Sequence, residues 1–365
     1  MAKAPLQKKK RPARKVVRRP AATPRRTRAR KPFVIDMHAH IQNPPEVMAF
    51  TKGRTIDSSI PPGTPEDLAA QDRRWVEDFT RKQNDLTLRL EEMDRAGVDV
   101  QVLTTGILRS CTYWATPEDG LRMDRLINDW TAELVARKPD RLVGLGSVPL
   151  QAPALAIKEL ERCMGPLGLK GVQVASCVGD VNAGGMELGD SRLDPFWAAA
   201  ERLGAVVFLH PAGVLGERWH RYQLWNSIGQ NNEEALAMAS LIYEGTMDRF
   251  PRLKLCVAHG GGFLPYYAGR IDRNYIEKAF TRVNLTKTPS DYLKQNFWYD
   301  TCIYNDDQFD YLVEKVGAER ILMGSDFPVG EEDPVQFVKR CRRLSSAAKE
   351  RILGLNAAEL LGLSV

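Results

Sequence analysis

Eight short apolar runs alternate with amphipathic segments along this chain, and no other feature restricts its fold as strongly. The runs are rich in β-branched residues and short enough for strands, and the segments between them carry apolar residues at helical spacing. The runs cover residues 33–38, 98–105, 141–149, 171–176, 205–210, 253–259, 297–302 and 321–326. Helical spacing is clearest in residues 84–97, 117–140, 194–204, 232–250 and 306–317. Apolar strands separated by helices are typical of a parallel sheet with both faces covered.

Eight such strand–helix units can close on themselves, which predicts an α/β fold of the (β/α)8 TIM-barrel type over residues 32–365. An open, doubly wound sheet is the alternative, but no G-x-G-x-x-G sequence follows the first run to support a dinucleotide site. Residues 41–80 are rich in Pro, Gly, Asp and Ser. We expect an enlarged loop there, and connections of that length inside a domain are usually functional.

Residues 1–31 differ in composition from the rest of the chain. The 365 residues carry a net charge of +6, yet residues 1–31 hold fourteen Lys and Arg and no acidic residue, which leaves a net charge of −8 elsewhere. We predict a disordered basic tail, because such a composition cannot form a core. The tail could contact nucleic acid or another polyanion. A solvated tail without a partner is an equal alternative.

The chain has no features of a secreted or membrane protein. The tail lacks the apolar segment of a secretory signal, and no apolar run approaches the roughly 20 residues that span a bilayer. The six cysteines are scattered and form no C-x-x-C pair; they are Cys111, Cys163, Cys177, Cys256, Cys302 and Cys341. We therefore expect reduced thiols, a cytoplasmic location and no membrane association.

Four of the five histidines occur where a predicted strand ends. His38 and His40 end the first run, and residues two apart in a strand project to the same side. His210 ends the fifth run, His259 ends the sixth, and Asp326 ends the eighth. Barrel active sites lie at the C-terminal ends of the strands, so we expect these five side chains to meet at one rim.

This set of residues indicates a metal site. An isolated H-x-H pair could equally be two surface histidines, but their convergence with further strand-end residues favours ligation. We predict that His38, His40, His210 and Asp326 bind one divalent metal ion, because imidazole and carboxylate suit zinc and its neighbours. His259 would lie close by and move protons. We count Asp326 with His259 among the catalytic residues. His220, in a predicted loop, receives no role.

The same residues resemble the amidohydrolase superfamily, and more narrowly its branch of decarboxylases similar to 2-amino-3-carboxymuconate-6-semialdehyde decarboxylase. The resemblance extends over residues 33–363. It is carried by the H-x-H pair and by "TYWATPED" (112–119), "RLVGLGSVPLQAPALAIKELERC" (141–163), "AHGGGFLPYYAGRIDR" (258–273), "GSDFP" (324–328) and "NAAELLGL" (356–363).

The resemblance implies a site with one metal ion, usually zinc and in some relatives manganese. Members with two metals usually carry a lysine at the end of strand four, whereas Lys170 precedes that strand here. His259 matches the catalytic histidine. Arg270 matches an arginine that reaches the substrate carboxylate of a neighbouring subunit, which implies a homodimer or a higher homo-oligomer.

The implied function is that of a metal-dependent decarboxylase that needs no organic cofactor and acts on an unsaturated or aromatic small-molecule carboxylic acid. Hydrolysis or hydration at the same site is the alternative. A polyanion-binding protein with an inactive barrel is the non-enzymatic alternative, and the complete ligand set argues against it.

The sequence departs from the decarboxylase branch at the substrate pocket. Ala212 and Gly213 replace a Trp-Asp pair that follows the strand-five His-Pro. The substrate-binding arginine expected after strand one has no clear counterpart, and Arg54, Arg73 and Arg74 are candidates.

Overall fold

All eight predicted strands are present at the positions of the apolar runs. The computed structural model describes residues 1, 32–50, 64–106, 112–181, 184–212, 219 and 221–364. The barrel strands are β1 (Ile35–Ile41), β2 (Val100–Thr105), β3 (Leu142–Gly144), β4 (Gly171–Val174), β7 (Val206–Leu209), β8 (Lys254–Val257), β9 (Phe297–Asp300) and β10 (Ile321–Leu322). A short antiparallel hairpin of β5 (Cys177–Val178) and β6 (Met186–Glu187) follows β4. The predicted basic tail lies outside the described residues, except for Met1.

The strands form two parallel sheets that together make a barrel. One sheet has the order β1-β2-β3 and the other β10-β9-β8-β7-β4. A single parallel bridge between Gly146 and Val172 joins β3 to β4, and another between Ala39 and Phe327 joins β1 to the segment after β10. The eight strands therefore follow one another in chain order around the barrel, as the predicted (β/α)8 fold requires.

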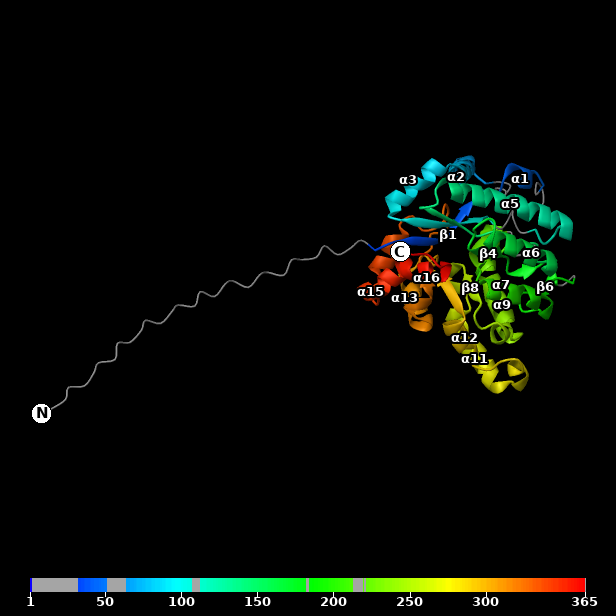
Figure 1. The fold of residues 1–365 in the computed structure, drawn as a ribbon, viewed down its shortest axis with the longest axis vertical. Helices are drawn as coiled ribbons and strands as arrows, with labels where there is room; N and C mark the ends of the chain where they lie inside the picture. The colour runs from blue at the N-terminus through cyan, green and yellow to red at the C-terminus, as the bar shows by residue number, and fades with distance from the viewer. Residues whose placement is uncertain are drawn as a thin grey trace. The chain divides into compact units, whose positions relative to one another are not determined.

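Helices surround the strands (Figure 1). They are α1 (Pro45–Phe50), α2 (Glu66–Asn84), α3 (Leu86–Ala96), α5 (Pro117–Arg137), α6 (Pro153–Met164), α7 (Asp194–Leu203), α9 (Gln230–Tyr243), α10 (Thr246–Arg249), α11 (Ala268–Glu277), α12 (Pro289–Gln295), α13 (Asp306–Val316), α14 (Pro334–Arg340), α15 (Ser346–Glu350) and α16 (Asn356–Leu361). Short 3₁₀ turns cover Ser191–Leu193, Arg221–Gln223, His259–Gly261, Pro265–Tyr267, Ala279–Arg282 and Ala318–Arg320, and π-helical turns cover Trp225–Gly229 and Arg351–Leu355.

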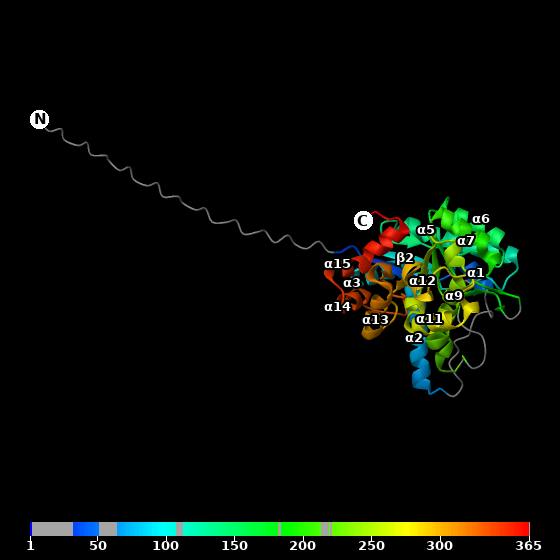
Figure 2. The same ribbon diagram turned by 90° about the horizontal axis from the view of Figure 1, so that it is seen from below.

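Two expectations about these connections are corrected. The predicted loop at residues 41–80 is largely helical where it is described, since it contains α1 and most of α2. α2 begins after Pro65, with Glu66 and Asp67 in its first turn and Arg81 and Lys82 in its last turn, which suits the helix dipole. α2 extends outward from the barrel in Figure 2. The helix expected over 232–250 is divided into α9 and α10, because Gly245 between them adopts a left-handed conformation (φ 74°).

The barrel interior is apolar at the end where the strands begin and polar at the end where they finish. Ile35 and Met37 of β1, Phe208 of β7 and Leu322 of β10 belong to one buried cluster inside the strands. Leu360 of α16 belongs to the same cluster, so this helix covers the end of the barrel where the strands begin. The opposite end, where the strands finish, is lined by buried His, Asp and Thr side chains. Within the described residues, no helix has the length and apolar character needed to cross a membrane.

Asp124 of α5 is an unusual buried carboxyl group outside that polar end. It is 0% exposed and accepts hydrogen bonds from the hydroxyls of Ser147 (2.7 Å) and Thr112 (3.0 Å). Burial, together with repulsion from Glu159, raises the pKa of Asp124 to about 8. The folded chain therefore binds a proton here that the unfolded chain releases above pH ~4.

This raised pKa predicts how stability depends on pH. Between pH ~4 and 8 the folded state binds more protons than the unfolded state, so the free energy of unfolding falls as pH rises. The side chain in Asp124→Asn stays neutral throughout this range. The free energy of unfolding of this variant, relative to that of the wild type, should therefore rise by up to about 1.4 kcal/mol per pH unit. Urea unfolding at several values from pH 5 to 8 measures this difference, with Asp140→Asn, an exposed turn residue, as the control. A difference between Asp124→Asn and wild type that does not change with pH would contradict the assignment.

Candidate metal centre

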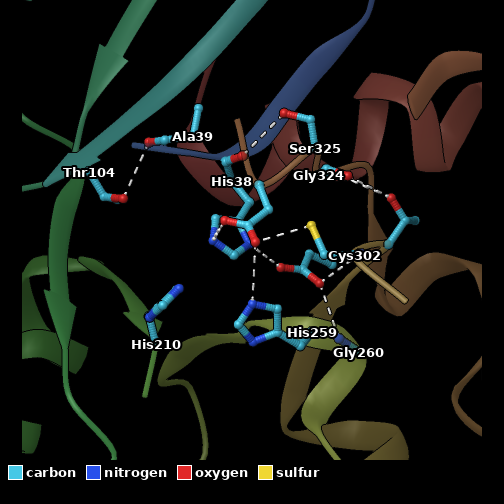
Figure 3. A network of polar contacts seen from close by, with 12 residues as sticks. His38, Ala39, Thr104, His210, His259, Gly260, Cys302, Gly324 and Ser325 are labelled. Carbon is cyan, nitrogen blue, oxygen red and sulfur yellow. Dashed lines mark hydrogen bonds and ion pairs between the residues drawn. The ribbon is translucent and has the colours of Figure 1, made fainter. Parts of the chain in front are cut away.

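The five predicted site residues meet at the end of the barrel where the strands finish. His38 and His40 lie on β1, while His210, His259 and Asp326 follow β7, β8 and β10. The Nε2 atoms of His38 and His40 are 3.1 Å apart. Oδ1 of Asp326 lies 3.2 Å from the first of them and 3.1 Å from the second. Figure 3 shows His38, His210 and His259 directed toward the same space.

His210 and His259 complete the cluster. The ring of His210 lies 5.0 Å from that of His40 and 5.1 Å from those of His38 and His259, measured between centroids. One donor atom from each of His38, His210, His259 and Asp326 lies within 4.8 Å of all the others.

The register between β1 and β2 shifts between Asp36 and Ala39. Despite that irregularity, His38 and His40 face the same space, as their spacing predicts.

The geometry of the donors fits a divalent metal ion. Two donors bound about 2.0–2.2 Å from one tetrahedral ion lie roughly 3.3–3.6 Å apart. The two Nε2 atoms of His38 and His40 and Oδ1 of Asp326 show nearly that spacing. Imidazole nitrogens with a carboxylate oxygen suit zinc and similar ions.

A second group of donors at the same end is a poorer metal site. His38, Asp300 and Cys302 also lie within range of one another. However, Nδ1 of His38 in this group already pairs with Asp300 Oδ2 at 2.6 Å. Burial and the nearby Asp300 raise the pKa of the Cys302 thiol well above its usual value. Since the thiolate is the form that binds metals, this group is better described as support for His38.

Each histidine of the cluster uses its Nδ1 atom to contact a neighbouring oxygen. The pairs are His38 with Asp300 (2.6 Å), His40 with Thr104 (3.0 Å), His210 with the carbonyl of Pro211 (3.0 Å) and His259 with Glu234 (2.6 Å). Such contacts fix the ring orientation and leave Nε2 directed at the centre, as is usual for histidines that bind metals.

The electrostatics keep two of the imidazoles neutral. Burial lowers the pKa of His40 below its ordinary value. Burial, with repulsion from His40 and His38, lowers the pKa of His210 well below its ordinary value. Asp326 has a pKa well below the usual range, because His38, His259 and His40 outweigh the opposite effect of its burial. Neutral imidazole and ionised carboxylate are the forms that bind metal ions.

His259 has the opposite character. Burial alone would lower its pKa, but the charge of Glu234, the charge of Asp326 and the hydrogen bond to Glu234 raise it well above the ordinary value. Burial in turn raises the pKa of Glu234 to about 7. Glu234 is fully buried on α9 and lies 2.6 Å from Nδ1 of His259. A histidine held in the protonated form beside neutral imidazoles is equipped to donate a proton.

A buried polar network holds the backbone beneath the two β1 histidines. Asp36 accepts hydrogen bonds from the backbone N–H of His38 (3.1 Å), the Oγ of Ser325 (2.6 Å) and the side chain of Gln101 (2.9 Å). Arg89 of α3 donates to Gln101 (2.6 Å) and to the backbone carbonyl of His40. The network joins β1, β2, α3 and the segment after β10, and so fixes the residues that carry the donors.

The backbone is strained at two of the five residues. Asp326 (φ 59°) and His259 (φ 49°) have the left-handed conformation that non-glycine residues rarely adopt. Such conformations persist where the surrounding structure enforces them, and they concentrate at functional sites. Gly262, whose added Cβ would lie 2.1 Å from the carbonyl oxygen of Asn231, lets the chain after His259 pack against α9.

The candidate arginines are exposed or lie outside the described residues. Arg73 and Arg74 are exposed on α2, and Arg73 pairs with Glu66. Arg270 is exposed near the start of α11. Arg54, like His220 and Gly213, lies outside the described residues. Lys170 precedes β4 and so lies at the opposite end of the barrel from the cluster. This position agrees with the expectation that the site holds a single metal ion.

Sequence reasoning missed four residues that contact the cluster, namely Thr104, Glu234, Asp300 and Tyr304. Asp300 had a usable signal, because it is an acidic residue close to the end of the apolar run at 297–302, as Asp326 is at the end of the run at 321–326. Thr104 and Tyr304 had none. Glu234 follows Glu233 on a helix whose apolar pattern is weak, and nothing in the sequence shows which of the two is buried.

Comparison with known proteins supports this fold. The chain is 38% identical over 283 residues to 2-amino-3-carboxymuconate-6-semialdehyde decarboxylase from Dictyostelium discoideum, covering 76% of this chain and 77% of the relative. It is 30% identical over 307 residues to a gamma-resorcylate decarboxylase from Polaromonas sp., covering 80% and 92%. A solved dihydroxybenzoic acid decarboxylase from Polaromonas sp., with bound manganese and the inhibitor 2-nitroresorcinol, superposes with a TM-score of 0.78 at 26% identity, covering 91% of this chain and 97% of that one.

The family model described as amidohydrolase matches residues 35–363, which include every barrel strand and all five residues of the cluster. The expected resemblance is therefore confirmed, and this chain belongs to the amidohydrolase family.

Proposed function

We propose that this protein is a metal-dependent carboxy-lyase that removes carbon dioxide from an aromatic or unsaturated carboxylic acid without an organic cofactor. The observation that carries the proposal is the position of His259, whose proton is stabilised by Glu234 and which lies 3.7 Å from Asp326 within the donor cluster. Relatives that include an aminocarboxymuconate semialdehyde decarboxylase and a gamma-resorcylate decarboxylase support this reaction. They favour it over hydrolysis or hydration, which the donor set alone would also allow.

In this proposal the four residues His38, His40, His210 and Asp326 hold one divalent ion. When bound, the ion would orient the substrate through its oxygen atoms and stabilise the negative charge that develops on them. The neutral His40 and His210 and the ionised Asp326 are suited to this role. Zinc is our preferred ion because most of the donors are imidazoles. Manganese is the alternative, and it is the ion bound by the Polaromonas enzyme.

His259 then supplies the proton for the reaction. Its Nε2–H donates to the carbon that bears the carboxylate, and Glu234 holds the imidazolium through Nδ1 until the transfer. The bond between that carbon and the carboxylate breaks, carbon dioxide leaves, and the bonding electrons restore the conjugated double bonds. Solvent returns a proton to His259. Each turnover thus consumes one carboxylate and one proton and releases one carbon dioxide.

We further propose that Arg270 binds the substrate carboxylate of a neighbouring subunit in a homodimer. Its exposed position near the start of α11 is compatible with reaching another chain. A cytoplasmic location is supported by the five described cysteines, all of which are free. Contact of the basic tail, residues 1–31, with a polyanion stays a prediction from its charge.

Carbon dioxide release is the direct test of the reaction. Wild-type protein should release it from at least one member of a panel of carboxylated muconates, hydroxybenzoates and amino- or nitro-aromatic acids. His259→Asn should lower kcat about 10²–10⁴-fold, the usual contribution of general acid–base catalysis, while its metal content stays at the wild-type level. Incorporation of ¹⁸O from labelled water into the product without carbon dioxide release would contradict decarboxylation. Loss of metal in His259→Asn would instead make His259 a ligand.

The proposed ligands predict the metal content. As purified, the protein should hold about one divalent ion per chain by elemental analysis, and chelation should abolish turnover. The double variant His38→Ala/His40→Ala should lose most of this metal, because two of four donors are removed. His220→Ala, which changes the one histidine without an assigned role, is the matched control. Wild-type metal content in the double variant would contradict the ligand set.

Mixing inactive variants tests the role of Arg270. Arg270→Ala and His259→Ala chains should each be inactive alone, but a mixed dimer would contain one site with both residues intact and should regain activity. Arg270→Ala mixed with the double variant Arg270→Ala/His259→Ala is the control, since no chain then supplies the arginine. Absence of recovery in the first mixture, with exchange of chains verified by mass-tagged subunits, would show that Arg270 does not act across the interface.

A further inference from the structure

Tyr304 contacts the cluster from a segment to which the sequence motifs assign no role. It lies four residues after the end of β9. Its hydroxyl donates a hydrogen bond of 3.2 Å to Oδ2 of Asp326, while half of the residue's surface remains exposed. The ring therefore lies at the surface and its hydroxyl points inward to a proposed metal ligand.

The backbone and a glycine hold Tyr304 in this position. Tyr304 has a left-handed conformation (φ 60°), like Asp326 and His259 beside it. A bulky residue adopts this conformation only where the surrounding structure enforces it. A Cβ atom added to Gly330 would lie 2.2 Å from the carbonyl oxygen of Ser325, 2.7 Å from the Tyr304 hydroxyl and 2.7 Å from Cβ of Asp326. Only glycine at position 330 leaves room for the tyrosine hydroxyl to reach the carboxylate.

The two oxygen atoms of Asp326 consequently have different surroundings. Oδ1 lies 3.2 Å and 3.1 Å from the Nε2 atoms of His38 and His40. Oδ2 lies 3.2 Å from the Tyr304 hydroxyl and 3.7 Å from Nε2 of His259. Tyr304 is thus the closer of the two donors to Oδ2, and it occupies the oxygen that His259 would otherwise approach.

We propose that Tyr304 is a positioning residue that holds Oδ2 of Asp326, so that only Oδ1 serves the metal ion and Nε2–H of His259 stays free for the substrate. This inference rests on the function proposed above. Without the tyrosine hydroxyl, Oδ2 would turn toward the ion as a second ligand atom. That change would move the Asp326 carboxylate from its position beside His259 and impair proton delivery without removing a metal ligand.

The variant Tyr304→Phe tests this role, because it removes the hydroxyl and keeps the ring. Tyr266→Phe is the matched control, since the Tyr266 hydroxyl donates to the backbone carbonyl of Gln308 (3.4 Å) and not to the cluster. Both variants should hold about one cobalt(II) ion per chain after metal substitution. The visible absorption of cobalt(II) reports its coordination. It should weaken in Tyr304→Phe, where Asp326 is free to bind through both oxygens, and stay unchanged in Tyr266→Phe.

Turnover gives the second measurement. In Tyr304→Phe, kcat should fall about 10–100-fold, the weight of one hydrogen bond to a charged group, while KM changes much less because Tyr304 contacts Asp326 and not the substrate. A wild-type cobalt spectrum together with a wild-type kcat in Tyr304→Phe would overturn the proposal. If no acid of the panel releases carbon dioxide with wild-type protein, the proposed function fails, and the cobalt spectrum still decides whether Tyr304 controls the carboxylate.

Discussion

The close approach of Asp326 Oδ1 to the Nε2 atoms of His38 and His40 is the contact on which the rest of the site depends. Two imidazole nitrogens and one carboxylate oxygen, each about 3 Å from the others, have nearly the spacing of donor atoms that share one metal ion. The barrel brings together three strands that are far apart in the chain. Hydrogen bonds on the outer side of each ring then fix the orientation of each donor.

The arrangement of hydrogen bonds and charges separates two roles within one cluster. His40 and His210 contact a hydroxyl and a backbone carbonyl, so their burial keeps them neutral. His259 contacts the buried carboxylate of Glu234, so its proton is stabilised. The partner of Nδ1 thus separates His259 from His40 and His210. His38 also pairs with a carboxylate, that of Asp300, and its pKa is raised as well. Tyr304 would maintain the difference by occupying the one Asp326 oxygen that His259 could reach.

The barrel and the donors could be predicted from the sequence because both follow from strand ends. Apolar runs locate the strands, and parallel strands of a barrel end at one rim, so His210 and Asp326 could be placed together although 116 positions separate them. The supporting residues could not be predicted in this way. Glu234 and Arg89 lie on helices, where burial depends on how the helix packs. The cluster of Pro and Gly at 44–63 predicts a loop over residues 41–80, whereas α2 begins shortly after this cluster, at Glu66.

X-ray absorption at the edge of the metal in the purified protein tests the central claim most directly. The account predicts a first shell of imidazole nitrogens with a carboxylate oxygen, at about 2.0–2.2 Å, and no sulfur. Sγ of Cys302 lies 3.5 Å from Nδ1 of His38. A metal ion bound to Nδ1 of His38, instead of Nε2, would therefore show a sulfur neighbour at about 2.3 Å. A sulfur atom in the first shell would contradict the assignment of His38, His40, His210 and Asp326 as the ligands.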